Sequence, residues 1–313
     1  MQKLMKSLIV AFAYMSMPIM AQKTDLVNPI IGTNGMGHTF PGACAPFGIV
    51  QVSPDTDTIP HNIDGVYQPR AYEYCAGYQH KDSSIVGFSH THFSGTGHSD
   101  LGDILLMPFT GKLQINPGTA DNPDSGYRSR FSHDTEISRP GYYEVLLTDD
   151  QIKVQLTATE RTGIHKYTYP ADQKKQLILD LNHGIYNYDG KVLWANLRVE
   201  NDTLVTGYRI TNGWSRVNYI YFAISFSQPV TRYGYTDREK VNYPGGFRRF
   251  NTAENFPEIG GRKVVSCKQS LPVNRLTRSA RKRMGNGRTH CPSSMQRAVT
   301  TSYPCFTLLC TIR

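Results

Sequence analysis

The chain of 313 residues is long enough for one large domain or two ordinary ones. Its apolar fraction of 39% and aromatic fraction of 11% exclude a wholly disordered protein and allow a sizeable core. The formal net charge of +9 comes from the end of the chain, because no acidic residue follows Glu258 whereas 11 basic residues do. The remainder has 23 basic and 25 acidic residues, so it has no electrostatic reason to bind nucleic acid.

Residues 1–21 are predicted to be a signal peptide. Lys3 and Lys6 precede a short apolar stretch that ends at Met20, which is too brief and broken for a permanent membrane anchor. We expect cleavage after Ala21, and the absence of a cysteine there argues against lipid attachment. The expected product is periplasmic or secreted, and an uncleaved apolar terminus is the alternative.

Residues 22–266 are predicted to form one domain that starts with short extended pieces and a strand at 48–53. Residues 87–93 then alternate as a strand does, which predicts that Phe88, His90 and His92 share one face. A glycine-containing polar loop from Ser94 to Asp103 follows, and then an apolar strand at 104–107. Such a loop between two strands is a common way to present a functional site.

The second half of this domain has the alternation and turn residues of an antiparallel meander. Asp149–Asp150 predicts a two-residue hairpin, and Asn212–Gly213 predicts a type I′ turn because both residues tolerate positive φ. No segment shows sustained helical periodicity, so we predict an all-β fold in which two antiparallel sheets form a sandwich. The predicted strands are 142–148, 151–159, 163–169, 175–181, 193–199, 204–210, 217–226 and 262–266.

Residues 74–108 contain the densest group of chemically functional side chains, and three interpretations stay open. A metal site is one, because paired strand histidines followed by His98, Asp100 and Asp103 offer suitable ligands. The second is a hydrogen-bonded sheet end without a ligand. The third is sugar binding, which needs aromatic faces and planar polar groups. The groups on offer for a sugar are Tyr72, Tyr74, Tyr78, Phe88, His90, His92 and Asp100.

Several long motifs resemble, in order, the N-terminal part of glycoside hydrolase family 92. They occupy residues 27–33, 38–43, 46–56 and 87–108, and the similarity extends over residues 24–265. The resemblance implies a large β-sandwich like that of galactose mutarotase, which precedes a helical (α/α)6 barrel in such enzymes. It also implies a secreted, calcium-dependent, inverting exo-α-mannosidase that acts on N-glycans or mannans.

In that family the N-terminal domain lends residues to the mannose-binding cleft, so the resemblance favours sugar binding here. The expected substrate-binding residues, in contact with sugar or with the barrel, are Tyr74, His90, His92, Ser94 and Asp100. The family's acid, base and calcium ligands lie largely in the barrel, for which this chain has no matching segment. We therefore predict no catalytic residue, no metal ligand and no cofactor for this chain, and no hydrolytic activity. A carbohydrate-binding module or a structural interaction domain is the alternative.

Residues 267–313 are predicted to be a disordered tail, because they lack acidic residues and apolar periodicity. We hypothesise that a frameshift produced this tail, and translation of the neighbouring reading frames would test that. A genuine basic tail and a nucleic-acid patch at Arg278–Arg283 are the alternatives. In the preceding domain, Cys44 and Cys75 could form a disulfide in an oxidising compartment.

Overall fold

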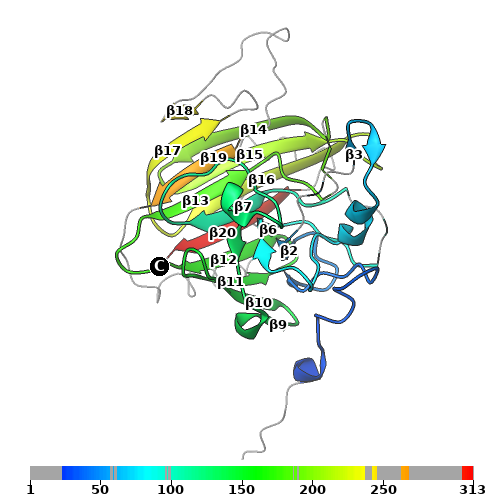
Figure 1. Cartoon of the computed structure of the whole chain (residues 1–313). Coiled ribbons are helices and arrows are strands. Elements are labelled where there is room, and N and C mark those ends of the chain that lie inside the picture. Colours follow the sequence, from blue (N-terminus) through cyan, green and yellow to red (C-terminus); the bar gives the residue numbers. More distant parts are fainter. Residues whose placement is uncertain are drawn as a thin grey trace, which may run out of the picture.

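The computed structural model describes residues 23–56, 59, 62–95, 97, 100–185, 187–188, 190–236, 242–244, 262–267 and 305–312. Almost all regular structure in these residues is β-strand (Figure 1). The helices are four short 3-10 turns, η1 (Lys23–Leu26), η2 (Pro69–Tyr74), η3 (Pro123–Ser125) and η4 (His133–Thr135). None of the described helices has the length and apolarity needed to span a membrane. The predicted signal peptide lies outside the described residues.

Most strands belong to two eight-stranded sheets (Figure 1). The first sheet has the order β1 (Ala43–Cys44), β2 (Gln51–Asp55), β6 (Gly87–Ser89), β7 (Leu105–Phe109), β13 (Lys175–Asp180), β19 (Arg262–Cys267), β17 (Val230–Thr236) and β18 (Asn242–Pro244). The second has the order β14 (Val192–Asn201), β15 (Leu204–Thr211), β16 (Asn218–Phe226), β20 (Cys305–Ile312), β12 (Thr162–Thr168), β11 (Ile152–Ala158), β10 (Tyr142–Leu147) and β9 (Ile137–Arg139). Two short pairs, β3 (Asn62–Ile63) with β4 (Val66–Tyr67) and β5 (Ser84–Ile85) with β8 (Ser129–Arg130), complete the fold.

All described strand pairs are antiparallel except those of β20 with β12 and β16. The predicted all-β antiparallel sandwich is therefore confirmed. The strand β20 comes from the predicted tail, and its apolar sequence CFTLLCTI suits an interior position in the second sheet. Residues 268–304 of the predicted tail lie outside the described residues.

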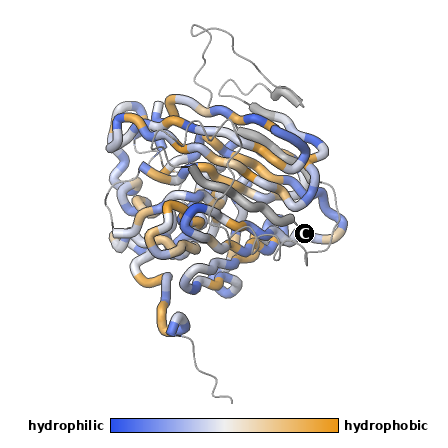
Figure 2. The backbone as a smooth tube through the Cα atoms, turned by 180° about the vertical axis from the view of Figure 1, so that it is seen from behind, coloured by the Kyte–Doolittle hydropathy of each residue, from blue (hydrophilic) through white to orange (hydrophobic). Residues whose placement is uncertain are grey.

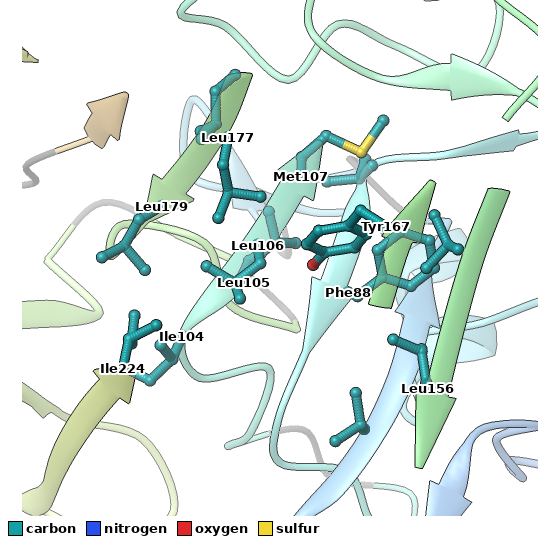
Figure 3. Close-up of a cluster of buried hydrophobic side chains, with 14 of the residues drawn as sticks. Phe88, Ile104, Leu105, Leu106, Met107, Leu156, Tyr167, Leu177, Leu179 and Ile224 are labelled. Carbon is teal, nitrogen blue, oxygen red and sulfur yellow. The ribbon is translucent and has the colours of Figure 1, made fainter. Parts of the chain in front are cut away.

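One continuous core joins the two sheets. The side chains of Leu105 and Leu179 from the first sheet belong to the same buried cluster as Leu156, Tyr167 and Ile224 from the second (Figure 3). The two sheets reach this core with different sequence patterns. Strand β10 alternates between buried and half-buried positions, whereas every residue of β7 is buried because both of its faces are covered. Hydrophobic and hydrophilic residues accordingly alternate along many strands in Figure 2.

The predicted strand at 87–93 is only partly correct. Strand β6 ends at Ser89, and the predicted alternation of faces does not separate buried from exposed residues, since Ser89 and Thr91 are also buried. The reason is that both faces of this segment are covered, so alternation no longer distinguishes a buried face from an exposed one. Backbone pairing continues beyond the strand, where the amide of His90 donates to the carbonyl of Asp103 over 2.9 Å.

The predicted type I′ turn at Asn212–Gly213 is wrong, although the hairpin it was meant to close is present. Strands β15 and β16 pair antiparallel, but the loop between them spans residues 212–217, and neither Asn212 nor Gly213 has a positive φ. The carboxylate of Asp100 accepts hydrogen bonds from the amides of Trp214 and Ser215, at 2.8 and 3.0 Å, and so holds a wider loop. A long-range contact thus overrides the local turn preference.

Two further expectations concern the first hairpin and the cysteines. Strands β10 and β11 form the predicted hairpin, with a loop of four residues, 148–151, instead of two, in which Gln151 has a φ of 53°. The cysteines Cys44 and Cys75 are free thiols, so the disulfide considered between them is absent.

The pairing of strands in the core predicts that two leucines contribute very differently to the free energy of unfolding. Leu106 is fully buried, opposite Phe88 on one side and Leu179 on the other, whereas Leu193 is 39% exposed. Leu106→Ala should lower the free energy of unfolding by roughly 2–5 kcal/mol, because it leaves a cavity. Leu193→Ala should cost less than about 1 kcal/mol. Denaturant unfolding of both variants measures the difference, and equal effects would contradict this core.

Candidate functional site

Three loops meet at one edge of the sandwich, and we call this region the loop junction. It consists of residues 90–104 between β6 and β7, residues 181–191 between β13 and β14, and residues 212–217 between β15 and β16. The amide of Ile185 donates to the carbonyl of Leu101 over 2.9 Å, and the amide of Asn212 donates to the carbonyl of Lys191 over 2.8 Å. The first of these bonds joins residues 84 positions apart in sequence and the second joins residues 21 positions apart.

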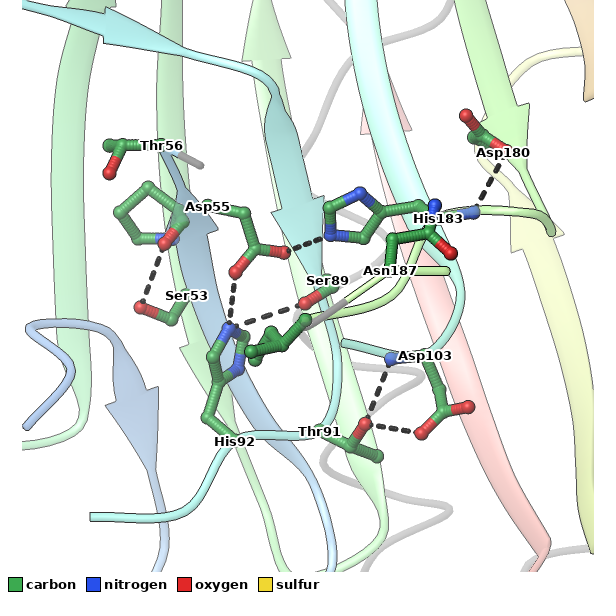
Figure 4. Close-up of polar contacts among 12 residues, drawn as sticks. Ser53, Asp55, Thr56, Ser89, Thr91, His92, Asp103, Asp180, His183 and Asn187 are labelled. Carbon is green, nitrogen blue, oxygen red and sulfur yellow. Dashed lines mark hydrogen bonds and ion pairs between the residues drawn. The ribbon is translucent and has the colours of Figure 1, made fainter. Parts of the chain in front are cut away.

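A buried carboxylate lies beneath the loop junction. Asp55, at the end of β2, is 1% exposed and contacts two histidines (Figure 4). One carboxylate oxygen is 2.9 Å from Nε2 of His92, and the other is 2.9 Å from Nε2 of His183. Gly77 makes room for this group, since a Cβ there would lie 2.2 Å from Oδ1 of Asp55.

Opposing effects act on the protonation of Asp55. Burial by itself raises its pKa, but the charges and hydrogen bonds of His92 and His183 outweigh burial, and the net pKa lies well below the usual range. Asp55 is therefore ionised at neutral pH. The Nδ1 atom of His92 also faces an acceptor, the carbonyl of Gln51 at 2.8 Å, which orients the ring. This arrangement connects β2 with two of the three loops.

A second buried charged group lies in the loop junction. Arg209 in β15 is fully buried and forms an ion pair with Asp103, with 3.0 Å between Nε and Oδ1. Its guanidinium also donates to the carbonyls of Leu181 and His183. The buried Lys191 donates to the carbonyl of Ile185, and burial together with the charge of Arg209 lowers its pKa to about 7. Arg209 and Lys191 thus donate hydrogen bonds to loop carbonyls that water cannot reach.

His90 belongs to a different network, which bridges the two sheets. Its Nδ1 donates to the carbonyl of Ile104, so its Nε2 is an acceptor for the Nε2–H of His165 in β12, 2.8 Å away. The Nδ1 of His165 then accepts from the hydroxyl of Tyr167 at 2.7 Å. Gly163 leaves space for this contact, because a Cβ there would lie 2.9 Å from Cδ2 of His90. This chain of bonds can form with both rings neutral.

The pKa shifts agree with neutral rings. Burial lowers the pKa of His90 to about 3, although its hydrogen bond to Ile104 opposes this effect. Burial and the neighbouring His90 lower the pKa of His165 well below its usual value. The two rings are therefore structural groups of the core at neutral pH, and they offer no proton for chemistry.

The five predicted substrate-binding residues divide into two groups. Tyr74, His90 and His92 are buried, and the hydroxyl of Tyr74 donates to Asp82 over 3.0 Å. Ser94 is exposed and Asp100 is partly exposed, so these two lie at the surface of the loop junction. The burial of the first three favours a scaffolding role for them. Sugar contact by any of the five stays a prediction.

Sequence reasoning missed two features of the loop junction. Trp214 is 77% exposed, and its backbone is held by Asp100. A Cβ on Gly213 would lie 1.9 Å from Oδ1 of Asp100, so glycine is needed for this close approach. The Asn212–Gly213 pair predicted a turn, but it did not predict that the tryptophan after it is exposed and bound to the loop from Ser94 to Asp103. No sequence pattern predicts the partners of Asp55 and Arg209, because only folding brings each of these residues to its partners.

Among the residues that the structure describes, those considered for a metal site at 90–103 form no group of three ligands that could hold an ion. His90 and His92 belong to separate networks, Asp103 pairs with Arg209, and His98 lies outside the described residues. In the described part of the chain, one group of three potential ligands is found elsewhere, formed by His80, His133 and Glu136. Calcium prefers six to eight oxygen ligands, so this group with two imidazoles does not fit calcium.

The neutral histidine pair predicts an acid-sensitive fold. The unfolded chain takes up these protons near pH 6.5, whereas folded His90 does so only near its pKa of about 3. Each buried ring should therefore reduce the free energy of unfolding by up to about 1.4 kcal/mol per pH unit as pH falls below 6.5. Asp55 adds its own loss only below about pH 3.9, its unfolded pKa.

His165→Gln tests this dependence, because the amide can donate to His90 and accept from Tyr167 but does not titrate. Urea unfolding between pH 7.5 and 4.5 should show a shallower loss of stability for this variant than for the unchanged chain. The measurement at pH 7.5 is the control for its folding. Identical slopes would contradict the neutral pair.

Comparison with known proteins places this fold in a family. The family model described as the glycosyl hydrolase family 92 N-terminal domain matches residues 26–268. An α-mannosidase of family GH92 from Bacteroides thetaiotaomicron, solved in complex with mannoimidazole, is 36% identical with a TM-score of 0.66, over 79% of this chain and 30% of that one. An inverting GH92 mannosidase from the same species has a TM-score of 0.57 at 22% identity, over 82% of this chain and 30% of that one, and shows the fold alone.

An uncharacterized secreted glycosidase of Arthroderma benhamiae is 29% identical over 146 residues, which are 46% of this chain and 17% of that protein. This chain therefore spans less than a third of the length of the relatives described here. The family model, in contrast, matches well over half of this chain. The chain belongs to glycosyl hydrolase family 92, as its N-terminal domain.

Proposed function

We propose that this chain is the N-terminal domain of a secreted, calcium-dependent, inverting exo-α-mannosidase that acts on N-glycans or mannans. In that enzyme it would contribute residues to the substrate-binding site. The observation that carries the proposal is the match of residues 26–268 to the family's N-terminal domain, together with 36% identity to a GH92 α-mannosidase. Export is supported by the predicted signal peptide at residues 1–21 and by a relative named as secreted.

We further propose that the chain by itself does not hydrolyse glycosides. An inverting glycosidase needs an acid and a base, two carboxyl groups about 6.5–9.5 Å apart with room for water between them. Four buried or partly buried carboxylates of the described residues are instead engaged with other side chains. Asp55 contacts two histidines and Asp103 contacts Arg209. Asp180 accepts from Tyr127, and Glu144 contacts Lys153, Tyr142 and Gln155.

The proposed contribution of this domain to the enzyme is the surface of the loop junction. Trp214 presents an aromatic face, and such faces pack against the C–H surfaces of sugars. Phe93, at 60% exposure, and Ser94 lie on the preceding loop and add an apolar and a hydroxyl group. Asp100 fixes Trp214 through the backbone, so we assign it a positioning role. In the complete enzyme this surface would face the mannose or the catalytic barrel.

The first test measures activity of the purified 313-residue chain on an aryl α-mannoside, with and without calcium. We expect no turnover above background in either condition. A chimera in which residues 26–268 replace the corresponding domain of the 36% identical Bacteroides relative should hydrolyse the same substrate. Turnover by the isolated chain would contradict the proposal that this chain by itself does not hydrolyse glycosides. A folded but inactive chimera would contradict the proposed function.

A stand-alone carbohydrate-binding module is the second candidate, and the exposure of Trp214 favours it over a purely structural interaction domain. Calorimetry with mannose and mannobiose should then show saturable binding that Trp214→Ala weakens at least tenfold, or about 1.4 kcal/mol. Phe47→Ala is the matched control, because Phe47 is a fully exposed aromatic outside the loop junction. The absence of binding to the unchanged chain would instead support the structural domain.

A further inference from the structure

His80, His133 and Glu136 form a compact group away from the loop junction. His80 lies in the turn between η2 and β5, His133 opens η4, and Glu136 directly follows η4. The pairing of β5 with β8 brings these segments together, and the amide of Phe131 donates to the carbonyl of Ser83 over 3.0 Å. Residues more than 50 positions apart in sequence thus face each other across one short two-stranded sheet.

The three side chains are close enough to share one ion. One potential ligand atom from each lies within 4.8 Å of the others. The rings of His80 and His133 have centroids 4.0 Å apart, and Nδ1 of His133 is 2.7 Å from Oε2 of Glu136. The side chain of His133 is 36% exposed, which leaves a path from solvent to the group.

Second-layer contacts hold the carboxylate in place. The side chain of Glu136 is 3% exposed, and its oxygens accept hydrogen bonds from the hydroxyl of Tyr78 at 2.9 and 3.0 Å. The hydroxyl of Tyr143 donates to the same carboxylate at 2.6 Å. Such outer hydrogen bonds orient the ligands of protein metal sites and are a large part of their affinity. The two tyrosine hydroxyls therefore orient the buried carboxylate of Glu136 for binding a cation.

We propose that His80, His133 and Glu136 bind a zinc ion, with water as the fourth ligand. Two imidazoles and one carboxylate with an open position are a common zinc coordination set. Calcium and magnesium prefer oxygen ligands, so the two nitrogens select a first-row transition metal. The ion would tie the turn after η2 to η4, and because it binds only the folded chain it would stabilise the fold.

The alternative is a hydrogen-bonded cluster that needs no metal, since Glu136 already accepts from His133 and two tyrosines. One substitution separates the two cases. His133→Gln keeps an amide that can donate to Glu136, but an amide is a poor zinc ligand. This variant should therefore fold as the unchanged chain does and lose the metal.

The experiment titrates the full chain, free of any affinity tag, with Zn²⁺ in competition with a chromophoric chelator. We expect one equivalent to bind, and His80→Ala, His133→Gln and Glu136→Gln each to weaken binding at least tenfold, which is about 1.4 kcal/mol. His38→Asn is the matched control, because it removes a histidine outside the group at a position of positive φ that asparagine tolerates. Its affinity should be unchanged, and circular dichroism checks that all variants fold.

Cobalt(II) then reports which side chains bind the ion. The unchanged chain should give visible d–d absorption without the near-ultraviolet charge-transfer band of a cobalt–thiolate bond, and His133→Gln should lose that absorption. Two results would overturn the proposal: zinc affinity that is the same in all four folded variants, or cobalt spectra with a thiolate band that persists in His133→Gln. Failure of zinc binding would leave the proposed glycosidase function untouched, because that function is tested by the chimera.

Discussion

The contact of Asp55 with His92 and His183 is the interaction on which the candidate site depends. An ionised carboxylate with 1% exposure is stable only when cationic or hydrogen-bonding partners replace its water. Here the partners come from two different loops, so satisfying one buried charge fixes both loops against β2. The ion pair of Arg209 with Asp103 adds a second constraint of the same kind. Contacts between buried charged groups of different segments therefore hold the loop junction together.

The same contacts distinguish residues that stabilise the fold from residues that are exposed for binding. His90, His92 and Tyr74 make polar contacts inside the fold, which favours a scaffolding role for them. The loop surface carries the groups that face solvent, foremost Trp214. The proposed role of the domain in an α-mannosidase follows from this surface and from the family membership. The His80, His133 and Glu136 group differs in kind, since its imidazoles lie at the surface over a buried carboxylate.

Prediction from sequence was accurate where local patterning decides structure. The alternating runs that became β10, β11, β12, β15 and β16 were located within a few residues, because a half-buried strand displays its period of two directly. It was less accurate at β6, where both faces are covered and alternation has no meaning. It was wrong about the turn at Asn212–Gly213. Asp100, more than 100 residues earlier in the chain, accepts a hydrogen bond from the amide of Trp214 and so determines the loop, and the local sequence pattern does not show this contact.

The amino-acid sequence by itself determined the fold class and the family, because strand periodicity and long ordered motifs are local properties that survive without coordinates. It also identified the stretch from Tyr74 to Pro108 as the one with the densest group of chemically functional side chains. Only the tertiary structure decided which side chain each histidine contacts. The pairs His92 with Asp55, His90 with His165 and His80 with His133 join positions 37, 75 and 53 residues apart. Such pairs form where strands bring distant segments together, and hydrogen-bond partners across a sandwich leave no spacing rule in the chain.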